Sequence, residues 1–300
     1  MRIKRGLKKG LAETRKIKIG GKGATRKSKT GKEFQMPERW DHFKITLTTR
    51  DDTGNFIVDK ETHDIIGTEP KQLSVMMPYD DVDLNFPTAY VYYKGKKLIC
   101  IGDAEKAMRG EKQIKCEPEK CPHAVKGECK ISGRLHCILS DAPALGCVAV
   151  LRTHSFHSVS NILNGLDSIA ENTGGILRGL PLRLELLDKE TADHGIIRVA
   201  NISFIAGDLK KLRESAIEEK QQRELLCIDV KMIEQKAIAE GDTEDHDDPA
   251  EVAAEFAPET GTAAEEAEDK ALEALGMPEE LGETFEQKKA RLKAAATNGS

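Results

Sequence analysis

Four of the seven cysteines in this 300-residue chain lie between Cys100 and Cys129, in a stretch rich in lysine and glycine and poor in apolar side chains. A segment of this composition buries too little apolar surface to fold on its own. Thiolates that converge on a zinc ion would give it a centre, because metal binding contributes folding free energy directly. The pattern therefore predicts a zinc-stapled loop over residues 100–134.

The expected zinc ligands are Cys116, Cys121 and Cys129, with a fourth ligand that the spacing leaves open. Cys100 is preferred because it ends a predicted strand that leads into the loop, and His123 is the alternative. The cysteines are separated by four and seven residues, which is wider than the two-residue spacing of zinc knuckles. Four ordinary reduced cysteines are therefore the competing interpretation.

The cysteine count also bears on location. Seven is an odd number, and the basic residues at the start are not followed by the apolar core of a secretion signal. Clustered cysteines in a reducing compartment indicate metal more often than disulfides. No stretch approaches the roughly 20 apolar residues that span a bilayer. We expect a cytoplasmic protein with no membrane partner.

Charge divides the chain into three parts. Residues 1–33 carry 13 Lys and Arg against two Glu, a net charge of +11, and residues 236–300 carry a net charge of −12. This predicts a basic flexible arm over residues 1–39 and an acidic, largely disordered tail over 239–300, with short helices over 263–275 and 284–296. A basic arm favours DNA, because each cation placed on a phosphate releases a counterion. Its candidate contacts are Arg2, Lys4, Arg5, Lys8, Lys9, Arg15, Lys16, Lys18, Arg26, Lys27 and Lys29.

Between these ends, residues 40–238 predict an α+β core of mixed and antiparallel strands with one or two packed helices. Alternating apolar and polar side chains indicate a strand over 42–50, and hairpins are expected over 89–100 and 182–205. Ser155 or Ser158 can cap a helix that runs to about Glu171. A second, charged helix is expected to follow Asp208 and to end near Leu226.

Other polar clusters point away from catalysis. Asp80, Asp81 and Asp83 could hold a hard cation for a metal-dependent hydrolase, but their setting favours a polar turn. His154 and His157 precede a predicted helix and favour capping or surface roles. The residues thus predict a zinc-containing binding protein with no small-molecule substrate rather than an enzyme.

A series of short motifs over residues 40–205 resembles one known family. The motifs, in chain order, are His42-Phe-Lys-Ile-Thr46, Asp81-Val-Asp-Leu-Asn-Phe86, Cys100-Ile-Gly-Asp103, Cys121-Pro122, Gly127-Glu-Cys129-Lys130, Ser132-Gly-Arg-Leu135, Arg152-Thr-His-Ser155, Ser158-Val-Ser-Asn-Ile162 and Gly179-Leu-Pro-Leu182. Together they resemble the phage recombination directionality factor-like proteins, relatives of the excision factor of Streptomyces phage phiC31. Members are often labelled as hydrolases or metal-binding proteins.

The resemblance implies a phage- or prophage-encoded accessory protein that binds a large serine integrase on DNA in a bacterial host. Such a factor favours excision (attL × attR) over integration (attP × attB) by changing how the integrase's coiled-coil arms pair. It also implies that Cys100, rather than His123, completes the metal site. Two alternatives stay open: a zinc-containing nucleic-acid-binding protein of phage replication or repair, and a metal-dependent hydrolase.

Overall fold

We describe a computed structural model of the chain over residues 11–27, 33–52, 55–94, 97–144, 146–191 and 195–240. Within these ranges, twelve strands form one branched sheet. The strands are β1 (Ala12–Lys27), β2 (Glu33–Arg50), β3 (Phe56–Val58), β4 (Gln72–Met76), β5 (Thr88–Lys94), β6 (Lys97–Gly102), β7 (Lys106–Arg109), β8 (Lys112–Lys115), β9 (Cys129–Leu139), β10 (Cys147–Thr153), β11 (Leu182–Thr191) and β12 (Gly195–Phe204). The helices are α1 (Lys60–Ile66), α2 (Val82–Asn85), α3 (Pro122–Val125), α4 (Phe156–Thr173), α5 (Leu209–Leu225) and α6 (Val230–Glu240).

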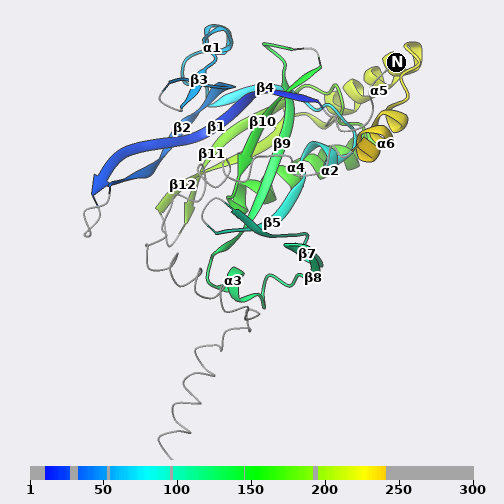
Figure 1. Cartoon of the computed structure of the whole chain (residues 1–300). Coiled ribbons are helices and arrows are strands. Elements are labelled where there is room, and N and C mark those ends of the chain that lie inside the picture. Colours follow the sequence, from blue (N-terminus) through cyan, green and yellow to red (C-terminus); the bar gives the residue numbers. More distant parts are fainter. Residues whose placement is uncertain are drawn as a thin grey trace, which may run out of the picture.

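The main path of the sheet runs in the order β3-β2-β1-β10-β9-β5-β6-β7-β8 (Figure 1). The pairing of β1 with β10 is parallel, and the other strand pairings are antiparallel. Strand β9 is the branch point: it pairs with β10, with β5, and near its end with β4, which leads on to β11 and β12. The α+β prediction is confirmed.

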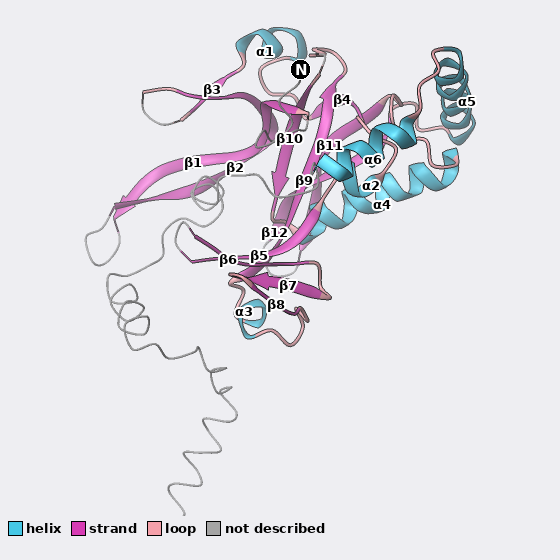
Figure 2. Cartoon of the chain, turned by 45° about the vertical axis from the view of Figure 1, so that its right-hand side comes forward, coloured by secondary structure: helices cyan, strands magenta, loops and turns pink. Residues whose placement is uncertain are grey.

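Helices α2, α4, α5 and α6 gather on one side of the sheet, whereas α3 lies by the β7–β8 hairpin (Figure 2). Helix α4 supplies the main contact, since its apolar residues Val159, Ile162 and Leu166 are at most 1% exposed. They pack with Leu135 of β9 and Leu151 of β10 in one continuous core. This arrangement explains the apolar period of the α4 sequence, because residues three and four apart share a helix face.

The ends of α4 follow the expected capping chemistry. The Ser155 hydroxyl accepts a hydrogen bond from the backbone N–H of Ser158 at 3.3 Å, so Ser155 is the N-cap. At the other end Gly174 adopts a left-handed conformation, with φ of 70°, that glycine tolerates without steric cost. The predicted helix is thus confirmed. The strand over 42–50 and both predicted hairpins are also present, as is the helix after Asp208.

The prediction of a flexible arm over residues 1–39 is wrong where the structure can test it. Residues 12–27 form β1, which pairs with β2 on one side and with β10 on the other. Ile17 is only 2% exposed and belongs to the core. Lysine and isoleucine alternate over 16–19, which is a strand pattern, but the charge of the segment obscured it. Residues 1–10 and the acidic tail from 241 onward lie outside the described residues.

No helix within the described part of the chain is long and apolar enough to cross a membrane.

Candidate functional site

The four clustered cysteines come from four different local structures. Cys100 lies on β6, Cys116 follows β8, Cys121 is the N-cap residue of α3, and Cys129 begins β9. The segment between them is not an irregular loop, because β7 and β8 form a hairpin that extends the edge of the sheet. We refer to residues 100–134 as the cysteine region. Its regular pairing brings sequence-distant thiols to one end of the sheet.

Cys100 and Cys129 flank Tyr92 on the same face of the sheet. Strand β5 lies between β6 and β9, and Tyr92 is the register partner of both cysteines. Two strand spacings separate the cysteine backbones, which corresponds to about 9.6 Å. His123 of α3 stacks on the Tyr92 ring with centroids 4.3 Å apart, and its Nδ1 lies 2.7 Å from a Glu128 carboxylate oxygen. The expected alternative ligand therefore lies over the same face.

The thiols are close enough to influence one another electrostatically. Burial raises the pKa of Cys129 to about 11, and the neighbouring thiols of Cys121, Cys100 and Cys116 add to the increase. Burial also raises the pKa of Cys116, with smaller contributions from Cys100 and Cys121. Both effects favour the protonated thiol, so a metal would have to displace protons on binding.

Gly102 makes room for one of these thiols. A Cβ atom at Gly102 would lie 2.9 Å from the Cys116 sulfur, closer than van der Waals contact allows. The glycine two residues after Cys100 thus lets Cys116 pack against β6. Within the described residues, however, no three His, Cys, Asp or Glu side chains lie as close together as metal ligands do. The donor types suit zinc, and the zinc site itself stays a prediction.

Some of the basic residues assigned to the arm make contacts within the fold, and the others have no described side chain. Arg15 bonds the Asp59 carboxylate at 2.7 Å and donates to the Ala142 carbonyl at 2.8 Å, so it holds β1 to the body. Burial alone would raise the pKa of Asp59, but hydrogen bonds from Thr62 and Arg15 lower it overall. Of the other arm residues, Lys16 and Lys18 have described side chains. At Arg26 and Lys27 only the strand backbone is described. Six candidates lie outside the described residues: Arg2, Lys4, Arg5, Lys8, Lys9 and Lys29.

Lys16 also differs from the expectation of a free arm. It is 7% exposed, lies 3.5 Å from the Glu13 carboxylate, and places its ammonium 4.6 Å from the centre of the Phe56 ring. Lys18 places its ammonium over the same ring at 4.4 Å. Both side chains therefore lie along the sheet surface, where cation–π contacts hold them in place.

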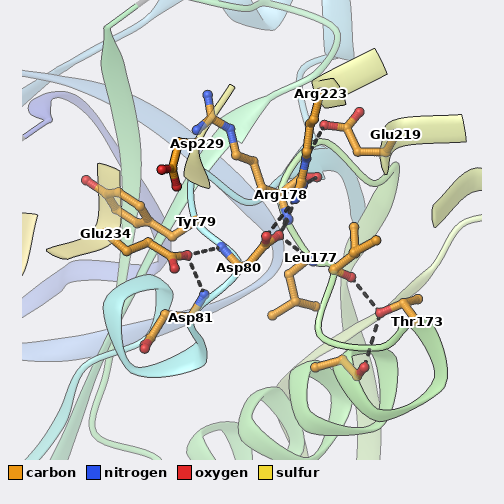
Figure 3. Close-up of polar contacts among 12 residues, drawn as sticks. Tyr79, Asp80, Asp81, Thr173, Leu177, Arg178, Glu219, Arg223, Asp229 and Glu234 are labelled. Atoms are coloured by element: carbon orange, nitrogen blue, oxygen red, sulfur yellow. Dashed lines mark hydrogen bonds and ion pairs between the residues drawn. The ribbon is translucent and has the colours of Figure 1, made fainter. Parts of the chain in front are cut away.

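A polar cluster around Asp80 was missed by sequence reasoning (Figure 3). The Asp80 carboxylate accepts hydrogen bonds from the backbone N–H groups of Leu177 and Arg178 at 2.9 and 2.8 Å. It also accepts two from the Arg223 guanidinium of α5, at 2.6 and 3.1 Å. Glu219 binds the same guanidinium at 3.0 Å. One carboxylate thus joins the loop before α2, the loop after α4, and α5.

Helix α6 also contacts the Asp80 turn, through the Glu234 side chain. A Glu234 carboxylate oxygen accepts from the backbone N–H groups of Asp80 and Asp81 at 2.7 and 3.0 Å. Asp81 in turn caps α2 by accepting from the Leu84 N–H at 2.9 Å. The predicted polar turn is thus confirmed for these two aspartates, whose carboxylates are engaged in structural contacts. The partners of Asp80 lie 97 to 154 residues away, so no local pattern could reveal them.

The two histidines before α4 have protein partners as well. His154 Nδ1 lies 2.9 Å from the Ile131 carbonyl oxygen, and His157 Nδ1 lies 3.2 Å from the Lys189 ammonium. The structure therefore places them in separate contacts.

The chain matches a model of a known protein family. The model described as "Gp3-like: Recombination directionality factor-like" matches residues 16–209. The match runs from within β1 to the first residue of α5, and it includes the cysteine region and the Asp80 turn. No curated protein and no solved structure shows significant similarity to the chain.

Proposed function

This chain belongs to the Gp3-like, recombination directionality factor-like family, and from that membership we propose that it binds a large serine integrase on DNA and favours excision over integration. The observation that carries the proposal is the family match over 194 consecutive residues, which spans the sheet from β1 to β12 and helix α4. The family match supports a role in phage recombination. The integrase and the direction of its reaction are our inference.

The proposed mechanism is a shift in a conformational equilibrium. An integrase complex that pairs attL with attR must adopt an arrangement of its protomers that is sparsely populated when the integrase acts alone. A factor that binds this arrangement more tightly raises its population, and a factor that binds both arrangements equally changes nothing. Moving the ratio from 1:99 to 99:1 requires about 10⁴-fold tighter binding to the favoured arrangement. No bond is made or broken by the factor itself.

Reconstituted recombination tests this proposal. The serine integrase encoded by the same phage or prophage should recombine attP × attB without the factor and attL × attR with it. We expect equimolar factor to invert the product ratio, measured on plasmid substrates. An integrase from an unrelated phage serves as the control and should not respond. An unchanged product ratio with the cognate integrase would refute the proposal.

We further propose that the cysteine region binds one structural zinc ion through Cys100, Cys116, Cys121 and Cys129. Cys100 and Cys129 flank Tyr92, whose ring stacks on His123, and a closed tetrahedral shell of thiolates is typical of structural zinc. Zinc would fix α3 and the start of β9 to β6. A rigid cysteine region would then present a constant surface to a partner.

Metal analysis of the purified protein checks the zinc proposal. We expect about one zinc per chain in the wild type and a large loss in Cys121→Ser, because removing one of four ligands opens the coordination shell. Cleavage within residues 101–134 in limited proteolysis should become faster in the variant. Cys227→Ser, at an exposed cysteine outside the region, is the matched control and should retain zinc. Wild-type protein without zinc, prepared without chelators, would contradict the proposal.

A further inference from the structure

A cleft opens where strand β5 begins and strand β6 ends. Its volume is about 380 Å³, within the range of about 300–1,000 Å³ that is typical of ligand pockets. Pro87, Ala89 and Ile131 line it with apolar atoms, and Asp83 of α2 and Asp103, which follows β6, add two carboxylates. We call this the acidic cleft.

Two polar groups of the acidic cleft are open to a ligand. Asp83 is exposed in the first turn of α2, and the cap of that helix is supplied by Asp81 instead. Among the described residues, the Asp83 carboxylate has no hydrogen-bond or ion-pair partner. The Tyr90 hydroxyl, which also lines the cleft, likewise has no partner in the described part of the chain.

The second carboxylate is held in place by its own turn. Asp103 Oδ1 accepts hydrogen bonds from the backbone N–H groups of Lys106 and Glu105, at 2.7 and 2.9 Å. These two bonds lower the pKa of Asp103, and the Lys106 charge contributes less. The turn between β6 and β7 therefore fixes a negative charge at the rim of the acidic cleft.

An apolar cleft of about 360 Å³ adjoins the acidic one across β6 and β7. The two clefts share Ala89 and Asp103, and Ile101 and Met108 line the second. Ile101 and Met108 are register partners, so they lie side by side on one face of the sheet. Met108 is 45% exposed although its side chain is large and apolar. A flexible thioether side chain of this kind adapts to the shape of a bound group.

We infer that the two clefts bind a segment of the partner protein that presents an arginine next to a large apolar side chain. The apolar stem of an arginine fits the walls formed by Pro87 and Ile131, while its charged end reaches the carboxylates. A guanidinium has five N–H donors in a planar fork, so it can bond Asp83 and Asp103 together. The neighbouring apolar side chain of the segment then packs against Met108.

The charges of the acidic cleft argue against two other occupants. Its carboxylates repel phosphates, so DNA does not suit it. No three His, Cys, Asp or Glu side chains of the described ranges are grouped as metal ligands, so an organic cation suits two carboxylates better than a metal ion does. The inference rests on the proposed function only in naming the integrase as the protein that supplies the segment.

Methyl NMR of the full chain with the dipeptide Ac-Arg-Leu-NH2 tests the site without integrase. The methyl signals of Ala89, Ile101, Met108 and Ile131 should shift and saturate, because these residues line the two clefts. The same dipeptide with citrulline in place of arginine is neutral at the side chain. It should bind about tenfold more weakly, because hydrogen bonds to charged groups are the stronger ones.

Three variants assign the binding to the acidic cleft. Asp83→Asn should weaken binding of the arginine dipeptide by about tenfold. Asp83→Glu keeps the carboxylate and should retain most of the binding, which separates a lost charge from a lost fold. Asp167→Asn removes the same charge from an exposed position of α4 and should bind like wild type.

Capture of the cognate integrase by the full chain tests the source of the segment. Asp83→Arg should capture it about tenfold more weakly than wild type, because like charges would then meet at the interface. Asp167→Arg is the control and should capture it normally. If the wild-type chain captured no integrase, the proposed function would fail and the dipeptide measurement would still stand.

Two results would overturn the inference. One is equal binding of the arginine and citrulline dipeptides, or methyl shifts caused by Mg²⁺ alone and not by the arginine dipeptide. The other is an integrase that the wild type and Asp83→Arg capture equally well.

Discussion

Asp80→Ala is expected to destabilise the protein by about 3–5 kcal/mol, because it removes one of the two carboxylates that bind a largely buried arginine. The Arg223 side chain is 10% exposed, and Asp80 provides two of its hydrogen bonds. The same substitution also removes the acceptor of the Leu177 and Arg178 backbone N–H groups. Urea denaturation would give the free energy of unfolding. Hydrogen exchange over residues 209–240 should rise first, since Asp80 connects α5 to the body.

The neighbouring aspartate gives a matched control. Asp83 is exposed in the first turn of α2, so Asp83→Ala should change stability by no more than about 0.5 kcal/mol. In a double-mutant cycle, Asp80→Ala and Arg223→Met should together cost less than the sum of the single changes, because the second removes the buried guanidinium whose Asp80 partner the first has removed. A cost below 1 kcal/mol for Asp80→Ala would show that the pair does not hold α5.

Local patterns predicted the elements whose determinants lie within one segment. The helix after Ser155 carries its own cap, its apolar stripe and a terminal glycine, and the structure reproduces all three. The β5–β6 hairpin likewise follows from alternation on both sides of a predicted turn. The first strand was missed, although Lys16 and Ile17 begin an alternating run, because the surrounding charge suggested a flexible arm. Its pairing with β10 depends on contacts with residues 134 to 135 positions away.

The candidate site also has features that the sequence predicts and features that depend on distant contacts. The cysteine cluster is visible in sequence because its members lie within 30 residues. The pairing of Cys100 and Cys129 with Tyr92 cannot be predicted from the sequence, because it depends on the strand order.

Gly165 is the site of the second large stability prediction, because α4 lies directly on the β12 backbone there. A Cβ atom at Gly165 would lie 2.6 Å from the Ile202 carbonyl oxygen and 2.7 Å from an Ile202 methyl carbon. The carbonyl belongs to the paired hairpin β11–β12, so it cannot move by a side-chain rotation. Helix α4 would have to shift away from the strand, which would loosen the core at Ile162 and Leu166.

Helix propensity predicts the opposite sign for the same substitution, which makes Gly165→Ala diagnostic. In an exposed helix, replacing glycine by alanine stabilises by about 1 kcal/mol. Here we expect a loss of about 1–3 kcal/mol from overpacking, and a larger loss for Gly165→Leu, measured as a lower urea midpoint. Asn164→Ala, at the exposed neighbouring position, should be neutral or slightly stabilising. If Gly165→Ala raised the midpoint as Asn164→Ala does, α4 could not rest on Ile202, and the helix–sheet contact would have to be looser than the structure shows.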